Sequence, residues 1–236
     1  TVTIQEPERI RTLLTEVSAG MASGEWTSLP AEIYPITEAR AAFRRMQQAR
    51  HIGKIVLQIP NPLQPRDDRS YLITGGLGAI GLHTAAYLAQ LGAGDIVLTS
   101  RRAPDADAQR AIEEISERYN SRIHTFAADV GDESEVARLL DRIRAELPPL
   151  AGVAHLAGVL DDALLSQQSV ERFRTTLAPK AFGACHLDRL TREDDLDFFI
   201  VSSSVSSVFG SPGQSNYATA NALLDGLVAQ RRAEGL

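Results

Sequence analysis

The sequence has a single cysteine, Cys185, among its 236 residues. One cysteine excludes an internal disulfide and is typical of a protein from a reducing compartment. We expect Cys185 to be a small buried side chain on a helix, not a nucleophile. The chain also lacks a signal-peptide pattern and any apolar stretch of membrane-spanning length. These absences predict a soluble, cytoplasmic protein.

The chain also lacks an excess of basic residues and any spacing typical of metal ligands. The chain carries 24 Lys and Arg against 30 Asp and Glu, a formal net charge of −6, which argues against a nucleic-acid-binding surface. Its five histidines show no metal-ligand spacing, and its carboxylates are scattered. We therefore expect no metal site, and structural or solvent-facing roles for the histidines.

What the sequence does contain is a glycine-rich turn, within YLITGGLGAIGLHTAAYLAQLGA at residues 71–93. An apolar run expected of a buried strand precedes the glycines, and an apolar pattern of helical spacing, from Ile80 to Leu91, follows them. Glycines there let the backbone approach a pyrophosphate at the helix N-terminus. A second strand at 95–99 completes the context that this motif requires. The predicted dinucleotide contacts are Thr74, Gly75, Gly76, Gly78, Ala79 and Ile80.

The end of that second strand distinguishes NAD from NADP. An acidic residue there binds ribose hydroxyls, whereas arginine accommodates a 2′-phosphate through charge-assisted hydrogen bonds. The sequence has Ser100, Arg101 and Arg102 at this point. A solvated basic pair at a helix start is the alternative, and we predict NADPH as the cofactor.

Four residues near the end of the chain have the spacing of a proton-delivery system: Lys180, Ser204, Tyr217 and Asn221. A hydride that reaches a ketone carbon leaves charge on the oxygen, which needs a proton and preorganised donors. A tyrosine serves as the acid when a neighbouring cation stabilises its phenolate. Lys180 is the candidate cation, Ser204 a second donor and Asn221 a geometric support. Taken alone, the Ser–Tyr pair is explained equally well by hydroxyl side chains on an ordinary loop before a helix. The glycine turn upstream decides in favour of a carbonyl reductase.

Strand and helix patterns alternate from residue 71 onward. Strands are expected at 71–74, 95–99, 122–127, 152–155 and 196–202, and helices after the glycine turn, at 105–119, 132–146 and 169–190, and from 215. This alternation predicts an α/β fold with a doubly wound, Rossmann-like parallel sheet. Cofactors bind at the carboxyl ends of such strands, where all the candidate residues fall.

Residues 1–62 have a different pattern, with helices at 7–20 and 37–49, an extended piece at 31–35 and a strand at 53–59. Their apolar segments are too few for an independent core. A proline-rich connector follows, so we expect a fragment at 1–62, a linker at 63–70 and a catalytic unit at 71–236. Doubly wound reductases usually continue beyond the catalytic helix, so we expect this domain to be truncated at its C-terminal end.

From about residue 70, these motifs resemble the ketoreductase domain of modular (type I) polyketide synthases, a branch of the short-chain dehydrogenase/reductase superfamily. The matching segments are GGLGAIG at 75–81, TSRR at 99–102, DV at 129–130, HLAG at 155–158 and SNYATAN at 215–221. Free-standing members have lysine four residues after the tyrosine. Here that residue is Asn221 and the lysine is Lys180, an exchange typical of polyketide and animal fatty acid synthases.

The resemblance implies a reductase that uses NADPH on a β-ketothioester held by an acyl carrier protein. Tyr217 would donate the proton, and Ser204 would orient the ketone. Lys180 and Asn221 would serve tyrosine activation and a proton-relay water network. The further cofactor contacts implied are Asp129 and Val130 at the adenine, and Ala157 and Gly158 along the nicotinamide path.

Residues 1–59 resemble the C-terminal tail of a medium-chain enoylreductase, in LPAEIYPI at 29–36 and AFRRMQQARHIGKIVL at 42–57. In fully reducing synthase modules, the enoylreductase directly precedes the ketoreductase catalytic half. The resemblance therefore implies enoylreductase and dehydratase domains as neighbours, although no enoylreductase cofactor motif is present here. An ordinary N-terminal extension is the alternative.

Two segments at the expected rim of the site resemble the signature of B-type ketoreductases. Their residues are Leu160, Asp161, Asp162, Pro212 and Asn216. Phe209 stands where A-type domains have tryptophan, and Thr219 where epimerising B-type domains tend to have proline. The resemblance implies a D-configured (usually 3R) β-hydroxyl without α-epimerisation. For Asp161 and Asp162 alone, a helix N-cap pair is the alternative.

Two other functions stay open. One is a free-standing NADPH-dependent carbonyl reductase, which lysine in place of Asn221 would have supported. The other is a catalytically silent synthase domain that scaffolds its neighbours. Loss of the tyrosine, the lysine or the glycine turn would mark a silent domain, and all three are present.

Overall fold

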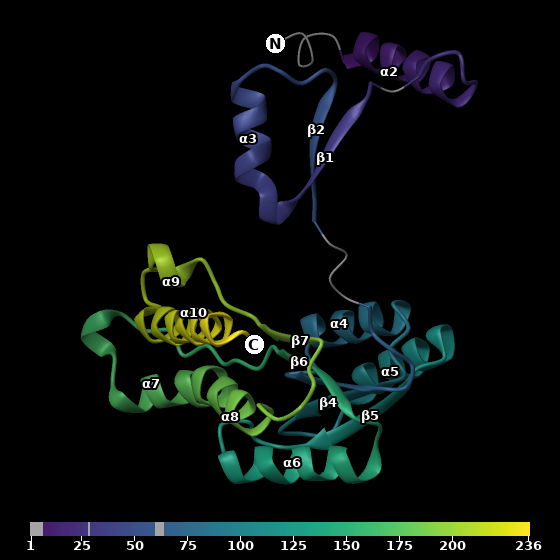
Figure 1. The fold of residues 1–236 in the computed structure, drawn as a ribbon. Helices are drawn as coiled ribbons and strands as arrows, with labels where there is room; N and C mark the ends of the chain where they lie inside the picture. Colours follow the sequence, from purple (N-terminus) through teal and green to yellow (C-terminus); the bar gives the residue numbers. More distant parts are fainter. Residues whose placement is uncertain (1–6, 28, 60–63) are drawn as a thin grey trace. The chain divides into compact units, whose positions relative to one another are not determined.

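The computed structural model describes residues 7–27, 29–59 and 64–236, which belong to two compact units divided between residues 62 and 63 (Figure 1). The predicted fragment at 1–62 and linker at 63–70 include residues 1–6, 28 and 60–63, which lie outside the described residues. Within the described ranges, no helix combines the length and the apolar character needed to cross a bilayer.

The first unit buries little apolar surface. Its elements are α2 (Pro7–Ala22), β1 (Ala31–Pro35), a 3-10 turn (Ile36–Glu38), α3 (Ala39–Gln47) and β2 (Lys54–Gln58). The two strands pair in parallel, with Ala31 opposite Lys54. Of the apolar side chains described in this unit, Ala42 is buried, whereas Phe43 and Met46 are exposed. A two-stranded sheet of this kind is too small to be stable alone.

The second unit is a parallel sheet with helices on both faces (Figure 1). Its strands are β3 (Ser70–Thr74), β4 (Asp95–Ser100), β5 (Arg122–Ala127), β6 (Leu150–His155) and β7 (Phe198–Val201), in the order β5-β4-β3-β6-β7. Every neighbouring pair is parallel. The chain begins in the centre with β3, fills one side, and then crosses to the other. This arrangement confirms the predicted doubly wound α/β fold and reverses the strand order between β3 and β6.

The alternation of side chains along β3 divides the core into two layers. Tyr71 and Ile73 pack with α4 (Ala79–Gln90) and α5 (Ala106–Tyr119). Leu72 packs on the opposite face with α6 (Glu133–Glu146) and α8 (Gly183–Leu190). All of β3 is buried, as expected of a central strand that is covered on both faces.

Side-chain caps explain where two of the helices begin. The Asp105 carboxylate accepts a hydrogen bond from the Ala108 N–H at 2.9 Å, so α5 starts directly after it. Asp132 accepts from the Ser134 N–H at 2.8 Å and begins α6 in the same way. Such caps satisfy N–H groups that have no partner within the helix.

The predicted helix over 169–190 is divided into three parts. Ser169 caps α7 (Val170–Leu177), which continues into a π-helical turn at Ala178–Phe182 and then into α8. Pro179 lies in this turn, and because proline has no N–H, the regular helical ladder cannot pass through it. The wider turn carries Lys180.

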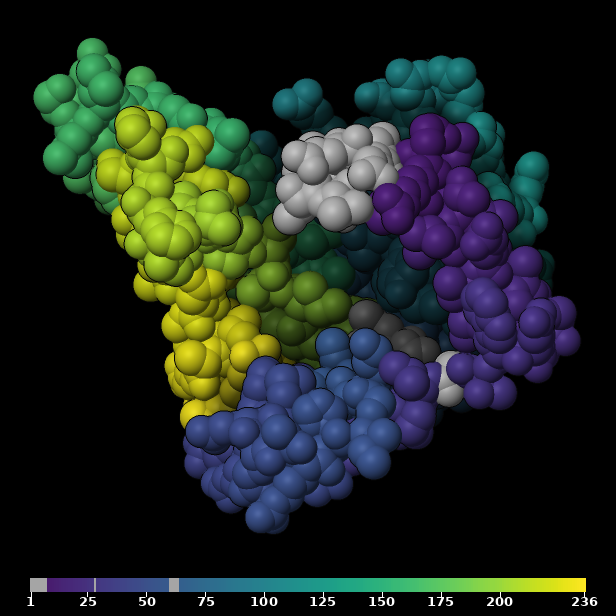
Figure 2. All heavy atoms as spheres, turned by 90° about the horizontal axis from the view of Figure 1, so that it is seen from above, coloured from purple at the N-terminus to yellow at the C-terminus, as the bar shows by residue number. Residues whose placement is uncertain are grey.

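The C-terminal elements include one short helix that the sequence analysis does not predict. This helix, α9 (Ser206–Phe209), lies between β7 and the long α10 (Ser215–Glu234). Both α7 and α9 contact α10. Figure 2 shows their atoms as neighbouring masses, with the green segment that includes α7 beside yellow-green and yellow.

Residues 66–70, which the sequence assigns to the linker, are part of the second unit. The Arg66 N–H donates to the Tyr71 hydroxyl at 2.6 Å, and its guanidinium pairs with Asp197 at 3.1 Å. Ser70 is the first residue of β3. A run rich in proline and charge indicates a connector, but such long-range contacts leave no local pattern in the sequence.

Candidate active site

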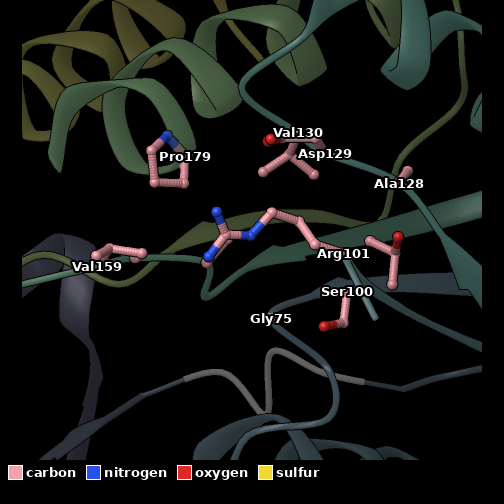
Figure 3. Close-up of a pocket in the computed structure, with 11 residues that line it drawn as sticks. Gly75, Ser100, Arg101, Ala128, Asp129, Val130, Val159 and Pro179 are labelled. Atoms are coloured by element: carbon pink, nitrogen blue, oxygen red, sulfur yellow. The ribbon is translucent and has the colours of Figure 1, made fainter. Parts of the chain in front are cut away.

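A cleft lies at the carboxyl ends of the parallel strands. Two cavities, of about 130 and about 550 Å³, share four lining residues and so form one hollow. The shared residues end β4 or follow β3 and β6: Gly75, Ser100, Ala157 and Gly158. Figure 3 shows the smaller cavity, which Ala128, Asp129 and Val130 also line. Ligands of doubly wound sheets bind at this kind of position, where the strand order reverses.

The glycine turn brings the main chain directly to the cleft. Gly75 has a φ of +65°, and a Cβ on it would lie 3.0 Å from backbone atoms of Ala157. A Cβ on Gly81 would lie 2.5 Å from the Gly75 carbonyl oxygen. The start of α4 therefore packs closely on the turn, and Gly78, Ala79 and Ile80 line the larger cavity. A backbone cradle at a helix N-terminus fits a pyrophosphate.

Three residues near the glycine turn lie elsewhere than the sequence predicts or away from the cleft. Ile80 does not belong to the apolar face of α4 that the sequence predicts, because it is 67% exposed at the cleft. Gly76 packs instead against β4, and a Cβ on it would lie 2.8 Å from the Leu98 Cβ. Thr74 is buried, with its hydroxyl 2.7 Å from the His155 Nδ1.

The two predicted phosphate-binding arginines lie in different places. Arg101 lines the smaller cavity, and its guanidinium points across it toward Val159 and Pro179 (Figure 3). Arg102 lines neither of these cavities but a third hollow with Pro104 and Phe126, which meets the larger cavity only at Leu77. The structure therefore does not bring both guanidinium groups to the predicted cofactor cleft. Consecutive residues at a strand end point in different directions, which explains why adjacency in the sequence is misleading here.

Asp129 and Val130 line the cleft on the side of β5. The Asp129 carboxylate accepts a hydrogen bond from the Gly131 N–H at 2.9 Å, and its own N–H donates to Glu135 at 2.7 Å. These bonds fix the turn between β5 and α6. Asp129 thus has a structural task in addition to its position beside the cavity.

Lys180 is buried beside the Tyr217 ring, and a hydrogen bond fixes its amine. Its side chain is only 4% exposed, and its Nζ donates to the Ser202 carbonyl at 2.7 Å. The same Nζ lies 5.1 Å from the centroid of the Tyr217 ring. Burial lowers the pKa of Lys180, since the charged amine is desolvated. The cation that the sequence predicts for Tyr217 is therefore beside it, although 37 positions separate the two along the chain.

Asn221 lies one helical turn after Tyr217 on α10 and is fully buried. Its Nδ2 donates to the Tyr217 carbonyl at 2.8 Å. Its Oδ1 is buried without a hydrogen-bond partner among the described residues. A buried acceptor in this condition is a suitable site for a water molecule.

The serines around Ser204 have distinct contacts. The Ser204 Oγ accepts from the Ser206 N–H at 3.2 Å, and its carbonyl accepts from the Ser207 Oγ at 2.9 Å. Ser203 donates instead to the Asn221 carbonyl at 3.4 Å, and Ser202 holds Lys180 through its own carbonyl. Because the Ser204 hydroxyl accepts its described bond, its proton is free to be donated to a ligand.

The two predicted stereocontrol segments form one hydrogen-bonded unit. The Asn216 Nδ2 donates to the Asp161 carbonyl at 2.7 Å, and Gln214 donates to the Asp162 carboxylate at 2.8 Å. The Ala163 N–H donates to the Gly213 carbonyl at 2.8 Å. Leu160 and Phe209 are exposed near these segments, 59% and 85% respectively.

The alternative of a helix N-cap for Asp161 and Asp162 is wrong. Neither residue precedes a helix directly, and Ser169 caps α7. The Asp161 carboxylate pairs with Arg172 on α7. Pro212 is exposed in the loop before α10, whereas Asn216 is buried in the first turn of that helix.

Several residues of the site were not predicted from the sequence, and outside the site the burial of Cys185 was predicted wrongly. The missed residues include Leu77, Ala128, Val159, Pro179 and, as a partner of Lys180, His155. The proline before Lys180 was the one available signal, since it is unusual within a helix. Cys185 is exposed on α8, so the expectation that it is buried is wrong.

Comparisons with known proteins agree with this geometry. The KR domain family matches residues 69–236, and the zinc-binding dehydrogenase family matches residues 2–57. The chain is 41% identical to the phenolphthiocerol synthesis polyketide synthase type I Pks15/1 of Mycobacterium marinum, over 98% of this chain and 11% of that protein. It is 40% identical to the spectinabilin polyketide synthase system protein NorB of Streptomyces orinoci, over 98% of this chain and 10% of that protein.

A third relative, Pks1 of Mycobacterium tuberculosis, is a polyketide synthase whose name describes it as inactive. It is 40% identical over 98% of this chain, which spans 14% of its length. Among solved structures, A-type ketoreductases from a modular polyketide synthase match with a TM-score of 0.69 and 40% identity, over 77% of this chain and 38% of theirs. A ketoreductase domain from the bacillaene assembly line matches with a TM-score of 0.70 and 29% identity, over 87% of this chain and 53% of its own.

Proposed function

Because the chain belongs to the ketoreductase domains of modular polyketide synthases, we propose that it reduces a β-ketothioester to a β-hydroxy thioester with NADPH. The substrate is carried on the phosphopantetheine arm of an acyl carrier protein. The observation that carries this proposal is the buried Lys180 amine 5.1 Å from the centre of the Tyr217 ring. A lysine is costly to bury, and its position at a tyrosine is what acid catalysis requires.

The residues of the cleft fit a dinucleotide. NADPH, when bound, supplies the hydride. The turn at Gly75, Gly78 and Ala79 would hold its pyrophosphate, because it brings the main chain and the N-terminus of α4 to the cleft, and Gly75 has a positive φ that disfavours any side chain. Arg101 would hold the 2′-phosphate, and the segment at 128–130 would line the adenine.

The catalytic residues then act on the ketone oxygen. Tyr217 donates a proton to this oxygen as the carbonyl is reduced, and Ser204 donates a hydrogen bond to it. The Lys180 ammonium stabilises the phenolate that Tyr217 becomes. Asn221, through its unpaired Oδ1, holds a water molecule that returns a proton toward the tyrosine.

The rest of the synthase supplies the partners. We assign residues 1–62 to the tail of a preceding enoylreductase, in agreement with the match of residues 2–57 to zinc-binding dehydrogenases. An acyl carrier protein would deliver the substrate, and a dehydratase followed by the enoylreductase would consume the alcohol. The expected compartment is the cytoplasm.

The first test measures turnover and product configuration together. The full-length protein is incubated with NADPH and a carrier-bound or small diketide β-ketothioester, and the alcohol is analysed by chiral chromatography. We expect a D-configured (usually 3R) alcohol, because the segments at 160–163 and 212–216 resemble the B-type signature. Joined by hydrogen bonds, they would guide the phosphopantetheine arm. A predominantly L-configured alcohol contradicts the stereochemical assignment. Absence of turnover contradicts the reductase assignment and favours a silent domain.

The second test concerns cofactor choice. Arg101→Ala should lower the NADPH/NADH ratio of kcat/KM by about tenfold or more, since it removes a charge-assisted bond to the 2′-phosphate. Arg102→Ala is the matched control, because Arg102 lines neither cavity of the cleft. We expect Arg102→Ala to change the NADPH/NADH ratio of kcat/KM by less than about threefold, which corresponds to less than about 1 kcal/mol. A larger effect for Arg102 than for Arg101 would move the phosphate site to the second hollow.

A further inference from the structure

His155 is a buried histidine whose two ring nitrogens are both bonded inside the protein. It is the last residue of β6 and is 1% exposed. Its Nδ1 lies 2.7 Å from the Thr74 Oγ1, and its Nε2 lies 2.8 Å from the Lys180 carbonyl oxygen. The ring thus joins the strand before the glycine turn to the π-helical turn that carries Lys180.

These partners determine the tautomer of the ring. The Lys180 carbonyl can only accept a hydrogen bond, so Nε2 carries the proton and donates it. In the neutral ring Nδ1 is then the acceptor, and the Thr74 hydroxyl donates to it. Burial lowers the pKa of His155 to about 4, and the nearby Lys180 charge acts in the same direction, so the ring is neutral at pH 7.

His155 holds Lys180 at both ends. Its side chain binds the Lys180 carbonyl, and its own carbonyl accepts a hydrogen bond from the Ser202 N–H at 3.1 Å. The Ser202 carbonyl in turn accepts from the Lys180 Nζ at 2.7 Å. These bonds form a closed circuit through three residues, which fixes both the backbone and the tip of the lysine.

The packing around the ring agrees with a specific role. A Cβ on Gly183, which follows the π-helical turn, would lie 3.0 Å from the His155 Cε1. The helix therefore approaches the ring closely only because this residue is glycine. An apolar side chain would fill the same volume, but it would leave the Lys180 carbonyl and the Thr74 hydroxyl without these partners.

We propose that His155 is a positioning residue for Lys180, and that its Nε2–H holds the π-helical turn so that the amine stays beside Tyr217. The kinetic part of this proposal rests on the proposed reductase function. The same ring contacts Thr74, so the cofactor turn and the lysine are positioned together.

Two substitutions separate the two ring nitrogens. His155→Gln can place an amide donor near the Nε2 position, whereas His155→Asn can replace only Nδ1. The full-length protein is labelled with an amine-acylating reagent without cofactor, and modification of Lys180 is followed by mass spectrometry. We expect Lys180 to react faster in His155→Asn, with His155→Gln close to wild type. His83→Asn, at an exposed position of α4, is the control for the substitution itself.

Kinetics give the second measurement. We expect His155→Asn to lower kcat by about 10- to 100-fold, because a shift of about 1 Å in a catalytic group has effects of this size. It should also displace the alkaline limb of the pH profile of kcat, whereas a loss of packing alone would not. His155→Gln should restore most of the rate and the wild-type limb.

The outcomes are distinct. Equal Lys180 labelling in wild type, His155→Asn and His155→Gln overturns the proposal, as does equal acceleration in both variants. If wild type fails to reduce a β-ketothioester, the proposed function is wrong, and the labelling still decides the role of His155. If His155→Asn does not fold, Thr74→Val replaces it. Thr74→Val removes the donor that keeps Nδ1 the acceptor and so releases the ring from the orientation in which Nε2–H meets the Lys180 carbonyl. Labelling of Lys180 should then accelerate, and unchanged labelling would show that a fixed ring is not needed to hold the lysine, which would overturn the proposal.

Discussion

Replacing Tyr217 by phenylalanine will lower kcat for β-ketothioester reduction by about 10²–10⁴-fold, the usual effect of removing a positioned proton donor. The ring remains, so its contact with the Lys180 amine is kept. The hydroxyl is the only part removed, and the cofactor cleft is lined by other residues. The dissociation constant for NADPH should therefore stay within about threefold of wild type, less than 1 kcal/mol.

The control for this substitution is Tyr87→Phe. Tyr87 lies on α4, is 54% exposed and does not line the cleft, so the same loss of a hydroxyl should leave kcat unchanged. Both variants are measured by NADPH consumption in the full-length protein and by fluorescence titration of NADPH. An undiminished rate for Tyr217→Phe would show that the catalytic assignment is wrong.

Gly81→Ala will weaken NADPH binding by tenfold or more, which corresponds to at least about 1.4 kcal/mol. The added Cβ would lie 2.5 Å from the Gly75 carbonyl oxygen and 2.6 Å from the Gly76 Cα. These are backbone atoms, so α4 must move away from the glycine turn. Overpacking of this kind also costs about 1–3 kcal/mol of folding stability, which thermal unfolding will detect.

Gly226→Ala is the matched control for the second prediction. Gly226 lies within α10, and a Cβ on it would have no neighbour within 4 Å. Alanine is the better helix former by up to about 1 kcal/mol, so this variant should be as stable as wild type or more so. If Gly81→Ala binds NADPH with wild-type affinity, the glycine turn does not hold the cofactor.

The sheet was predictable because each strand and helix is specified by nearby residues. Buried parallel strands give continuous apolar runs, and Asp105 and Asp132 mark the starts of α5 and α6 within one residue. The cleft followed from the topology, since parallel strands end on one side of the sheet. Only local patterns and one general rule were needed.

What could not be predicted depends on contacts between distant residues. The π-helical turn is stabilised by His155, 25 positions before Lys180. Asp161 has a partner on α7, so the local N-cap alternative failed. The directions of Arg101 and Arg102 depend on the exact course of the chain after β4, which no residue pattern specifies. Local sequence rules give the elements, and long-range hydrogen bonds determine where the side chains point.

The bonds between the segment at 160–163 and the segment at 212–216 have a consequence for engineering. The Gln214 amide binds the Asp162 carboxylate, so exchanging one of these residues removes the partner of the other, and Asn216 fixes the first segment through the Asp161 backbone carbonyl. A graft that transfers only one of these segments between ketoreductases would combine two segments from different proteins, whose contacting residues need not match. The two segments therefore act as a single cassette, and recombination should move them together or leave both in place.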